Sequence, residues 1–190
     1  MTLKTNAKKL ALIGLFLALL IVSSVVSKIP MYPVPMTLQT AVILCSAMLI
    51  GGVETFIVVA IYVFMGLIGI PVFAGSGAGI GYALSPTFGF IIGFAIGGLV
   101  TGLIAGRKTD ASWSRLIIAA MVGTAIFYVV GILYYLGLCA FYFGNEINIG
   151  KILLSFWILF IPSDVLKGAV AVFLAKKTRP VVAKMGIRAR

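Results

Sequence analysis

Residues 152–175 read ILLSFWILFIPSDVLKGAVAVFLA, an apolar stretch long enough to cross a bilayer and interrupted by Asp164 and Lys167. A charged side chain at the centre of a membrane helix costs roughly 2.5–3.5 kcal/mol on insertion scales. At positions i and i+3 these two side chains share one helix face, where they can pair with each other or with a ligand between them. The stretch therefore predicts a membrane helix with a functional ion pair, with a purely structural salt bridge as the alternative.

The composition of the whole chain indicates an integral membrane protein. Of its 190 residues, 62% are hydrophobic and only 10% are charged, whereas about a quarter are charged in a typical soluble domain. The first apolar run, residues 10–27, follows three lysines as in a signal peptide but lacks a convincing cleavage site. We therefore expect this run to be a retained helix, and residues 1–190 to form a single membrane domain.

Six apolar segments are predicted to be membrane helices, since a hydrocarbon core of about 30 Å needs roughly 20 helical residues. These segments are 8–28, 37–51, 53–69, 86–106, 112–138 and 151–176. Only Gly51-Gly52 separates the short second segment from the third, which predicts a helical hairpin inside the bilayer. The expected fold is an all-α bundle of six transmembrane helices.

The distribution of basic residues predicts the orientation of this bundle. Twelve of the fifteen lysines and arginines lie at the N-terminus, in the 107–115 connection, and in the tail beyond residue 175. Basic residues concentrate on the cytoplasmic side, so we expect a multi-pass protein of the plasma membrane with both termini in the cytoplasm. The net charge of +11 is explained by this topology, without nucleic acid as a partner.

The connections on the opposite side are rich in Gly, Pro and aromatic residues. They span residues 28–40, 69–86 and 138–150. Irregular backbone near membrane depth is tolerated only where protein buries it or where it lines a cavity. We therefore expect the first two connections to fold over a ligand pocket that opens outward.

Several classes of chemistry are excluded by what the sequence lacks. It has no phosphate-binding loop motif, and the absence of histidine rules out a serine–histidine pair or a histidine zinc site. Its two cysteines, Cys45 and Cys139, lack metal-binding spacing. An enzyme would have to use Asp164 and Lys167 alone, so we expect a protein that is not an enzyme and has no metal or cofactor.

A membrane pocket with a few polar groups among apolar walls suits a small amphipathic solute. Lys167 can receive a carboxylate or a carbonyl oxygen, and Asp164 can accept from N–H donors. The candidate ligand-binding residues are Asp164, Lys167, Gln39, Thr40, Tyr82 and Ser85. For the last four, ordinary roles at helix starts and turns are the alternative.

The first predicted helix carries small residues at four-residue spacing, Ala7 with Ala11 and Gly14 with Ala18. Small residues let a neighbouring membrane helix approach closely. We call these four residues the small-residue stripe and predict that a partner subunit binds there. Packing against other helices of the same chain is the alternative.

Four motifs spread over nearly the whole chain resemble the BioY family, the biotin-binding S components of energy-coupling factor (ECF) vitamin transporters. The motifs are PVPMTLQT (33–40), GLIGIPVFAG (66–75), SPTFGFIIGF (85–94) and PSDVLKG (162–168). The third departs from the family's usual pattern at Ser85, Phe88 and Phe90. The resemblance places the Asp and Lys of the family's last-helix motif at Asp164 and Lys167.

The resemblance also places the polar end of the family's TLQT motif at Gln39 and Thr40. It implies a six-helix subunit that captures biotin from outside and depends on a membrane T subunit and two cytoplasmic ATPases. A stand-alone transporter of biotin or a related vitamin is the alternative function. The Asp–Lys pair suits the ureido ring of biotin, although Lys167 could instead hold the carboxylate of its tail.

Overall fold

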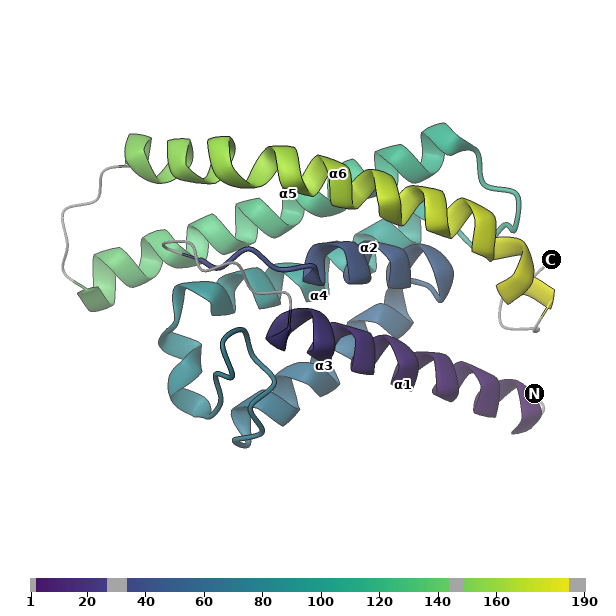
Figure 1. Ribbon diagram of the computed structural model, residues 1–190, viewed down its shortest axis with the longest axis horizontal. Coiled ribbons are helices and arrows are strands. Elements are labelled where there is room, and N and C mark those ends of the chain that lie inside the picture. Colours follow the sequence, from purple (N-terminus) through teal and green to yellow (C-terminus); the bar gives the residue numbers. More distant parts are fainter. Residues whose placement is uncertain (1–2, 27–33, 144–148, 185–190) are drawn as a thin grey trace.

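The computed structural model describes residues 3–26, 34–143 and 149–184, and its regular elements are helices (Figure 1). In chain order they are α1 (Leu3–Val25), α2 (Gln39–Leu49), α3 (Gly52–Leu67), a 3-10 helix η1 (Ile80–Leu84), α4 (Pro86–Ala105), α5 (Trp113–Leu138), a π-helical turn η2 (Cys139–Phe143) and α6 (Ile149–Lys184). The prediction of an all-α fold is confirmed. Three boundaries differ from the prediction by five residues or more. Helix α1 begins at Leu3 and not at residue 8, η2 extends α5 into the expected third outer loop, and α6 continues eight residues beyond residue 176, through Pro180.

Within the described residues, three helical stretches are long and apolar enough to cross a membrane: Ala7–Val25, Pro86–Ala105 and Trp113–Tyr142. Helices α2 and α3 are apolar but shorter, with 11 and 16 residues. At 1.5 Å per residue, α2 spans roughly 16 Å, about half of a hydrocarbon core. A count of six spans therefore remains a prediction.

The helices form three layers in Figure 1, with α5 and α6 above, α2 and α4 in the middle, and α1 and α3 below. Helix α4 packs against α2, α3 and α5, while α2 also packs against α1 and α6. The middle layer is thus enclosed from both sides. It brings the start of α2 close to the middle of α6.

Two adjacent glycines make the α2–α3 turn possible. Gly51 has φ +115°, a backbone conformation that side chains disfavour. A Cβ on Gly52 would clash with the carbonyl oxygen of Leu99, and one on Gly102 would clash with the backbone of Gly52. Helix α3 therefore starts directly against the α4 backbone, which fixes the hairpin that the sequence predicts.

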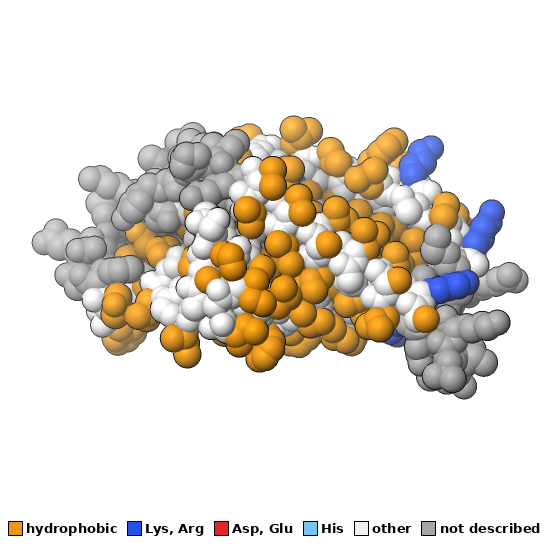
Figure 2. All heavy atoms as spheres, turned by 60° about the horizontal axis from the view of Figure 1, so that its bottom comes forward, with side chains coloured by type: hydrophobic (Ala, Val, Ile, Leu, Met, Phe, Trp, Pro, Cys, Tyr) orange, Lys and Arg blue, Asp and Glu red, His pale blue; other side chains and the backbone are white. Residues whose placement is uncertain are grey.

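Helix α1 begins and helix α6 ends at the same end of the bundle (Figure 1), and Figure 2 shows lysine and arginine side chains gathered at that end of the face it displays. An ion pair between Lys9 and Glu54 joins α1 to α3 there. Arg179, which is fully buried, donates through Nη2 to three carbonyl oxygens between residues 105 and 108, at 2.7–3.2 Å. Contacts between α1 and α3 and between α4 and α6 therefore hold this basic end together.

Candidate ligand-binding site

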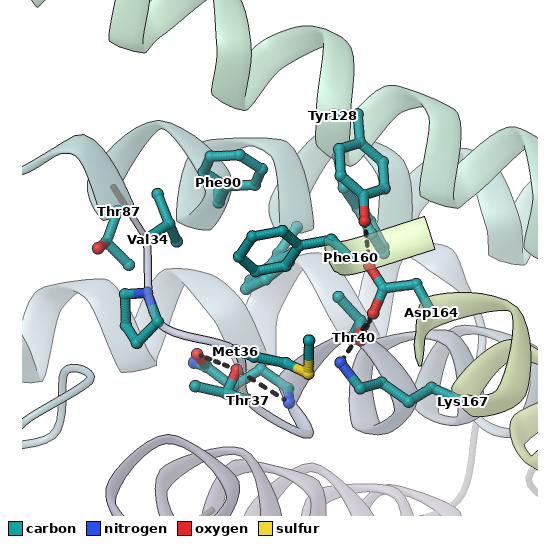
Figure 3. A pocket seen from close by; sticks show the side chains of 14 residues that line it. Val34, Met36, Thr37, Thr40, Thr87, Phe90, Tyr128, Phe160, Asp164 and Lys167 are labelled. Atoms are coloured by element: carbon teal, nitrogen blue, oxygen red, sulfur yellow. Dashed lines mark hydrogen bonds and ion pairs between the residues drawn. The ribbon is translucent and has the colours of Figure 1, made fainter. Parts of the chain in front are cut away.

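The Asp164 carboxylate is the centre of a buried polar cluster between α2, α5 and α6 (Figure 3). Its Oδ1 accepts from Lys167 Nζ at 2.8 Å and from Thr40 Oγ1 at 3.2 Å, and its Oδ2 accepts from Tyr128 Oη at 2.6 Å. Asp164 is 7% exposed and Lys167 is 9% exposed. Three donors on three helices therefore hold one carboxylate in an otherwise apolar interior.

The sequence placed Asp164, Lys167 and Thr40 in one site, and the structure brings these three together. Tyr128 was not foreseen, because the contact joins residues 36 positions apart. The only signal in the sequence is a tyrosine in the middle of an apolar helix, where its hydroxyl needs a buried partner. The ring of Phe90, one of the departures from the family pattern, meets the Tyr128 ring edge-on at 6.3 Å between centroids.

A cavity of about 40 Å³ lies beside this cluster. Its polar walls are Thr37, Gln39, Thr40, Thr87, Tyr128, Asp164 and Lys167, and its apolar walls are Val34, Pro35, Met36, Phe90, Phe94, Phe127 and Phe160. Figure 3 shows Met36, Phe90 and Phe160 pointing toward its middle. This volume has room for a few water molecules, whereas pockets for small ligands measure about 300–1,000 Å³. A larger ligand must therefore displace part of the wall.

Gln39 lines the cavity, but its amide is already engaged in a buried network. Its Nε2 donates to Tyr62 Oη at 3.0 Å, and its Oε1 accepts from Thr37 Oγ1 at 3.1 Å. Tyr62 Oη also lies 2.9 Å from Ser24 Oγ near the end of α1. Tyr62 thus links α1, the start of α2 and the cavity wall, a role that the sequence did not indicate.

Tyr82 and Ser85 do not belong to the described lining of this cavity. Tyr82 stacks on Phe73 with ring centroids 4.5 Å apart, and its hydroxyl donates to the carbonyl oxygen of Ala74 at 3.4 Å. Burial raises the pKa of its phenol above the usual value. Ser85 caps α4, where its Oγ accepts from the backbone N–H of Thr87 at 3.3 Å. In this structure both side chains organise the 69–86 connection and the start of α4.

The small-residue stripe of α1, consisting of Ala7, Ala11, Gly14 and Ala18, is exposed along its whole length. A Cβ added to Gly14 would meet no atom within 4 Å. The opposite face of α1 is buried through Ile13, Phe16 and Leu20. Packing within the chain therefore uses the large residues of α1 and leaves the stripe open, which disfavours the internal-packing alternative.

Comparison with known proteins gives concordant results. The model of the BioY family matches residues 1–184. A protein of Pyrococcus horikoshii described as a probable biotin transporter BioY is 32% identical over 172 residues, covering 90% of this chain and 96% of the relative. The biotin transporter BioY of Thermotoga maritima is 32% identical over 119 residues, covering 63% of this chain and 69% of the relative.

A solved structure shares the fold. It is the crystal structure of the S-component for biotin from an ECF-type ABC transporter, which superimposes with a TM-score of 0.82 over 95% of both chains at 24% sequence identity. The helical arrangement in Figure 1 is therefore that of an ECF S component.

Proposed function

This chain belongs to the BioY family, and from that premise we propose that it captures biotin on the outer side of the membrane as the substrate-binding subunit of an ECF-type importer. It is a membrane protein of a transporter family, and the prediction that it is not an enzyme is confirmed. The observation that carries the proposal is the buried Asp164–Lys167 pair, held at 2.8 Å beside a cavity.

The chemistry of this pair matches the ureido head of biotin, which offers two N–H donors and one carbonyl oxygen. Asp164 can accept one N–H, while Lys167 can donate to the oxygen. A single rigid group then satisfies both buried charges, and leaving either unpaired is costly. The hydroxyls of Thr40 and Tyr128 already point at the carboxylate and would keep it oriented.

The segment 34–37 is the wall that we expect to move when the ligand enters. It contributes four residues to the cavity and contains no helix. The 69–86 connection packs against α3 instead, because the Gly79 N–H donates to the Gly66 carbonyl oxygen at 2.8 Å and Phe73 lies over Gly66. We propose that the first connection caps the ligand and that the second supports it through Tyr62, whose ring meets Phe73 edge-on at 5.4 Å.

Calorimetry with the purified chain tests both the ligand and its orientation. We expect one biotin per chain and comparable binding of biotinamide, whose tail lacks the carboxylate, because the ureido ring is the recognised group. If biotinamide fails to bind while biotin binds, Lys167 holds the carboxylate instead. Absence of binding for both compounds would reject the biotin assignment.

We further propose six membrane passages with both termini and the 107–115 connection in the cytoplasm, supported by the gathering of basic side chains at one end of the bundle (Figure 2). Single cysteines at Lys108 and Lys184, in a chain without Cys45 and Cys139, should resist an impermeant thiol reagent in intact cells. A cysteine at the exposed Ser76 should react. Labelling of position 108 or 184 from outside would contradict this topology.

Energy for uptake must come from elsewhere, since the sequence has no phosphate-binding loop. We propose a membrane T subunit and two cytoplasmic ATPases as partners, with the exposed stripe of α1 as the contact surface. Stand-alone transport remains the alternative function. Biotin accumulation by cells that lack the T subunit would favour it.

A further inference from the structure

A second hollow lies between α5 and α6 and shares Tyr128 and Asp164 with the proposed biotin pocket. It has a volume of about 720 Å³ and runs from Trp113 at the start of α5 to Tyr128 and Asp164. Four small residues create it, Ala120 and Ala125 on α5 with Gly168 and Ala169 on α6. We call this hollow the α5–α6 groove.

The groove is long enough to span one membrane leaflet and more. From Trp113 to Tyr128 the α5 helix rises roughly 22 Å at 1.5 Å per residue. Half of a hydrocarbon core measures about 15 Å. The walls between the two ends are almost entirely apolar, with Thr124 as the exception on α5. The groove therefore suits a long and apolar occupant.

Positive charge lies near the Trp113 end of the groove. Trp113 is a residue type that favours the membrane interface, and its ring centroid lies 6.4 Å from that of Phe173. Lys177 Nζ lies 6.0 Å from the same Phe173 ring, and Lys176 Nζ donates to the Ala111 carbonyl oxygen at 2.8 Å. Two ammonium groups therefore lie near the Trp113 end, where a head group could reach them.

We propose that the α5–α6 groove binds a phospholipid with a negatively charged head group. Its acyl chain would lie between the two helices, and its phosphate would meet Lys176 and Lys177. Basic residues between membrane helices on the cytoplasmic side are a recurrent setting for anionic lipids. The inner end of the chain reaches Tyr128 and Asp164, which line both the groove and the biotin cavity. The lipid therefore forms the back wall of the ligand site.

Fluorescence quenching by brominated lipids tests this site directly. The full-length chain, with Trp157→Phe so that Trp113 is the only tryptophan, is placed in phosphatidylcholine nanodiscs that contain a minor fraction of brominated lipid. Brominated phosphatidylglycerol should quench Trp113 several-fold more than the same fraction of brominated phosphatidylcholine. Equal quenching by the two lipids would overturn the proposal, and it is the result expected if a protein helix or any neutral lipid is the true occupant.

Matched variants test whether the preference for phosphatidylglycerol arises in the α5–α6 groove. Ala125→Phe fills the groove and should abolish the preference for phosphatidylglycerol, whereas Ile118→Phe, at an exposed position of α5 outside the groove, should leave it intact. Lys177→Gln should reduce the preference, and Arg107→Gln, at an exposed position in the α4–α5 connection, should have a smaller effect. A preference that survives Ala125→Phe would place the lipid elsewhere. The readout needs no biotin, so its failure would leave the proposed function untouched.

Discussion

Replacing Asp164 with alanine should weaken biotin binding by about 3–5 kcal/mol, the usual cost of breaking one half of a buried ion pair. This corresponds to a rise in Kd of about two to three and a half orders of magnitude. The change removes the acceptor shared by Lys167, Thr40 and Tyr128, so one buried ammonium and two partly buried hydroxyls lose a partner at once. Calorimetry on the folded variant measures the effect.

Two further variants rank the contributions of the cluster's side chains to biotin binding. Lys167→Ala should weaken binding less than Asp164→Ala, because the carboxylate keeps its two hydroxyl donors. Tyr128→Phe removes a single hydroxyl and should weaken biotin binding by about 1–3 kcal/mol. If the Asp164→Ala protein folds and binds biotin within a few-fold of the original affinity, the assignment of the pair to the ligand is wrong.

Tryptophan at Gly14 should abolish ATP-driven uptake while biotin binding by the isolated chain persists. Gly14 lies in the middle of the exposed stripe, where an added side chain meets nothing within this chain. In a bilayer, close contact between helices depends on small residues, so a large ring should keep the T subunit away. Uptake by cells that express the whole transporter should fall at least about tenfold, equivalent to about 1.4 kcal/mol.

Further tryptophan variants on α1 distinguish a lost contact with the T subunit from disrupted packing within the chain. Ala11→Trp should repeat the effect of Gly14→Trp, since both positions lie on the stripe. Leu19→Trp, at a position that is exposed but turned away from the stripe, should retain uptake. Loss of biotin binding before loss of uptake would instead indicate that the stripe packs within the chain. Normal uptake in both stripe variants would remove α1 from the coupling surface.

Local sequence patterns predict several features of this fold. The Asp164–Lys167 contact follows from i, i+3 spacing on one helix, and the α2–α3 hairpin follows from a pair of glycines. Residue size at four-residue spacing identifies the stripe of α1, but it leaves open whether the stripe packs within the chain. Each of these features depends on neighbours in the sequence, where helix geometry alone decides which side chains meet.

Contacts between segments far apart in the chain could not be predicted from the sequence. Tyr128 reaches Asp164, and Tyr62 reaches Gln39 and Ser24, only because helices stack in a particular order. Tyr82 is a candidate because it is a polar side chain near the expected outer face, yet its ring stacks on Phe73. Polarity and position along the chain identify a polar group near the outer face. They do not specify whether it faces a cavity or a neighbouring ring.

The placement of both charges on one helix has an electrical consequence. Moving one elementary charge across the membrane involves about 2.3 kcal/mol per 100 mV of membrane potential. Asp164 and Lys167 are 2.8 Å apart on α6, so the pair carries no net charge and travels with a single helix. The empty site can therefore change its depth in the bilayer without electrical work from this pair. Any voltage dependence of the loaded site then comes from the charge of the solute.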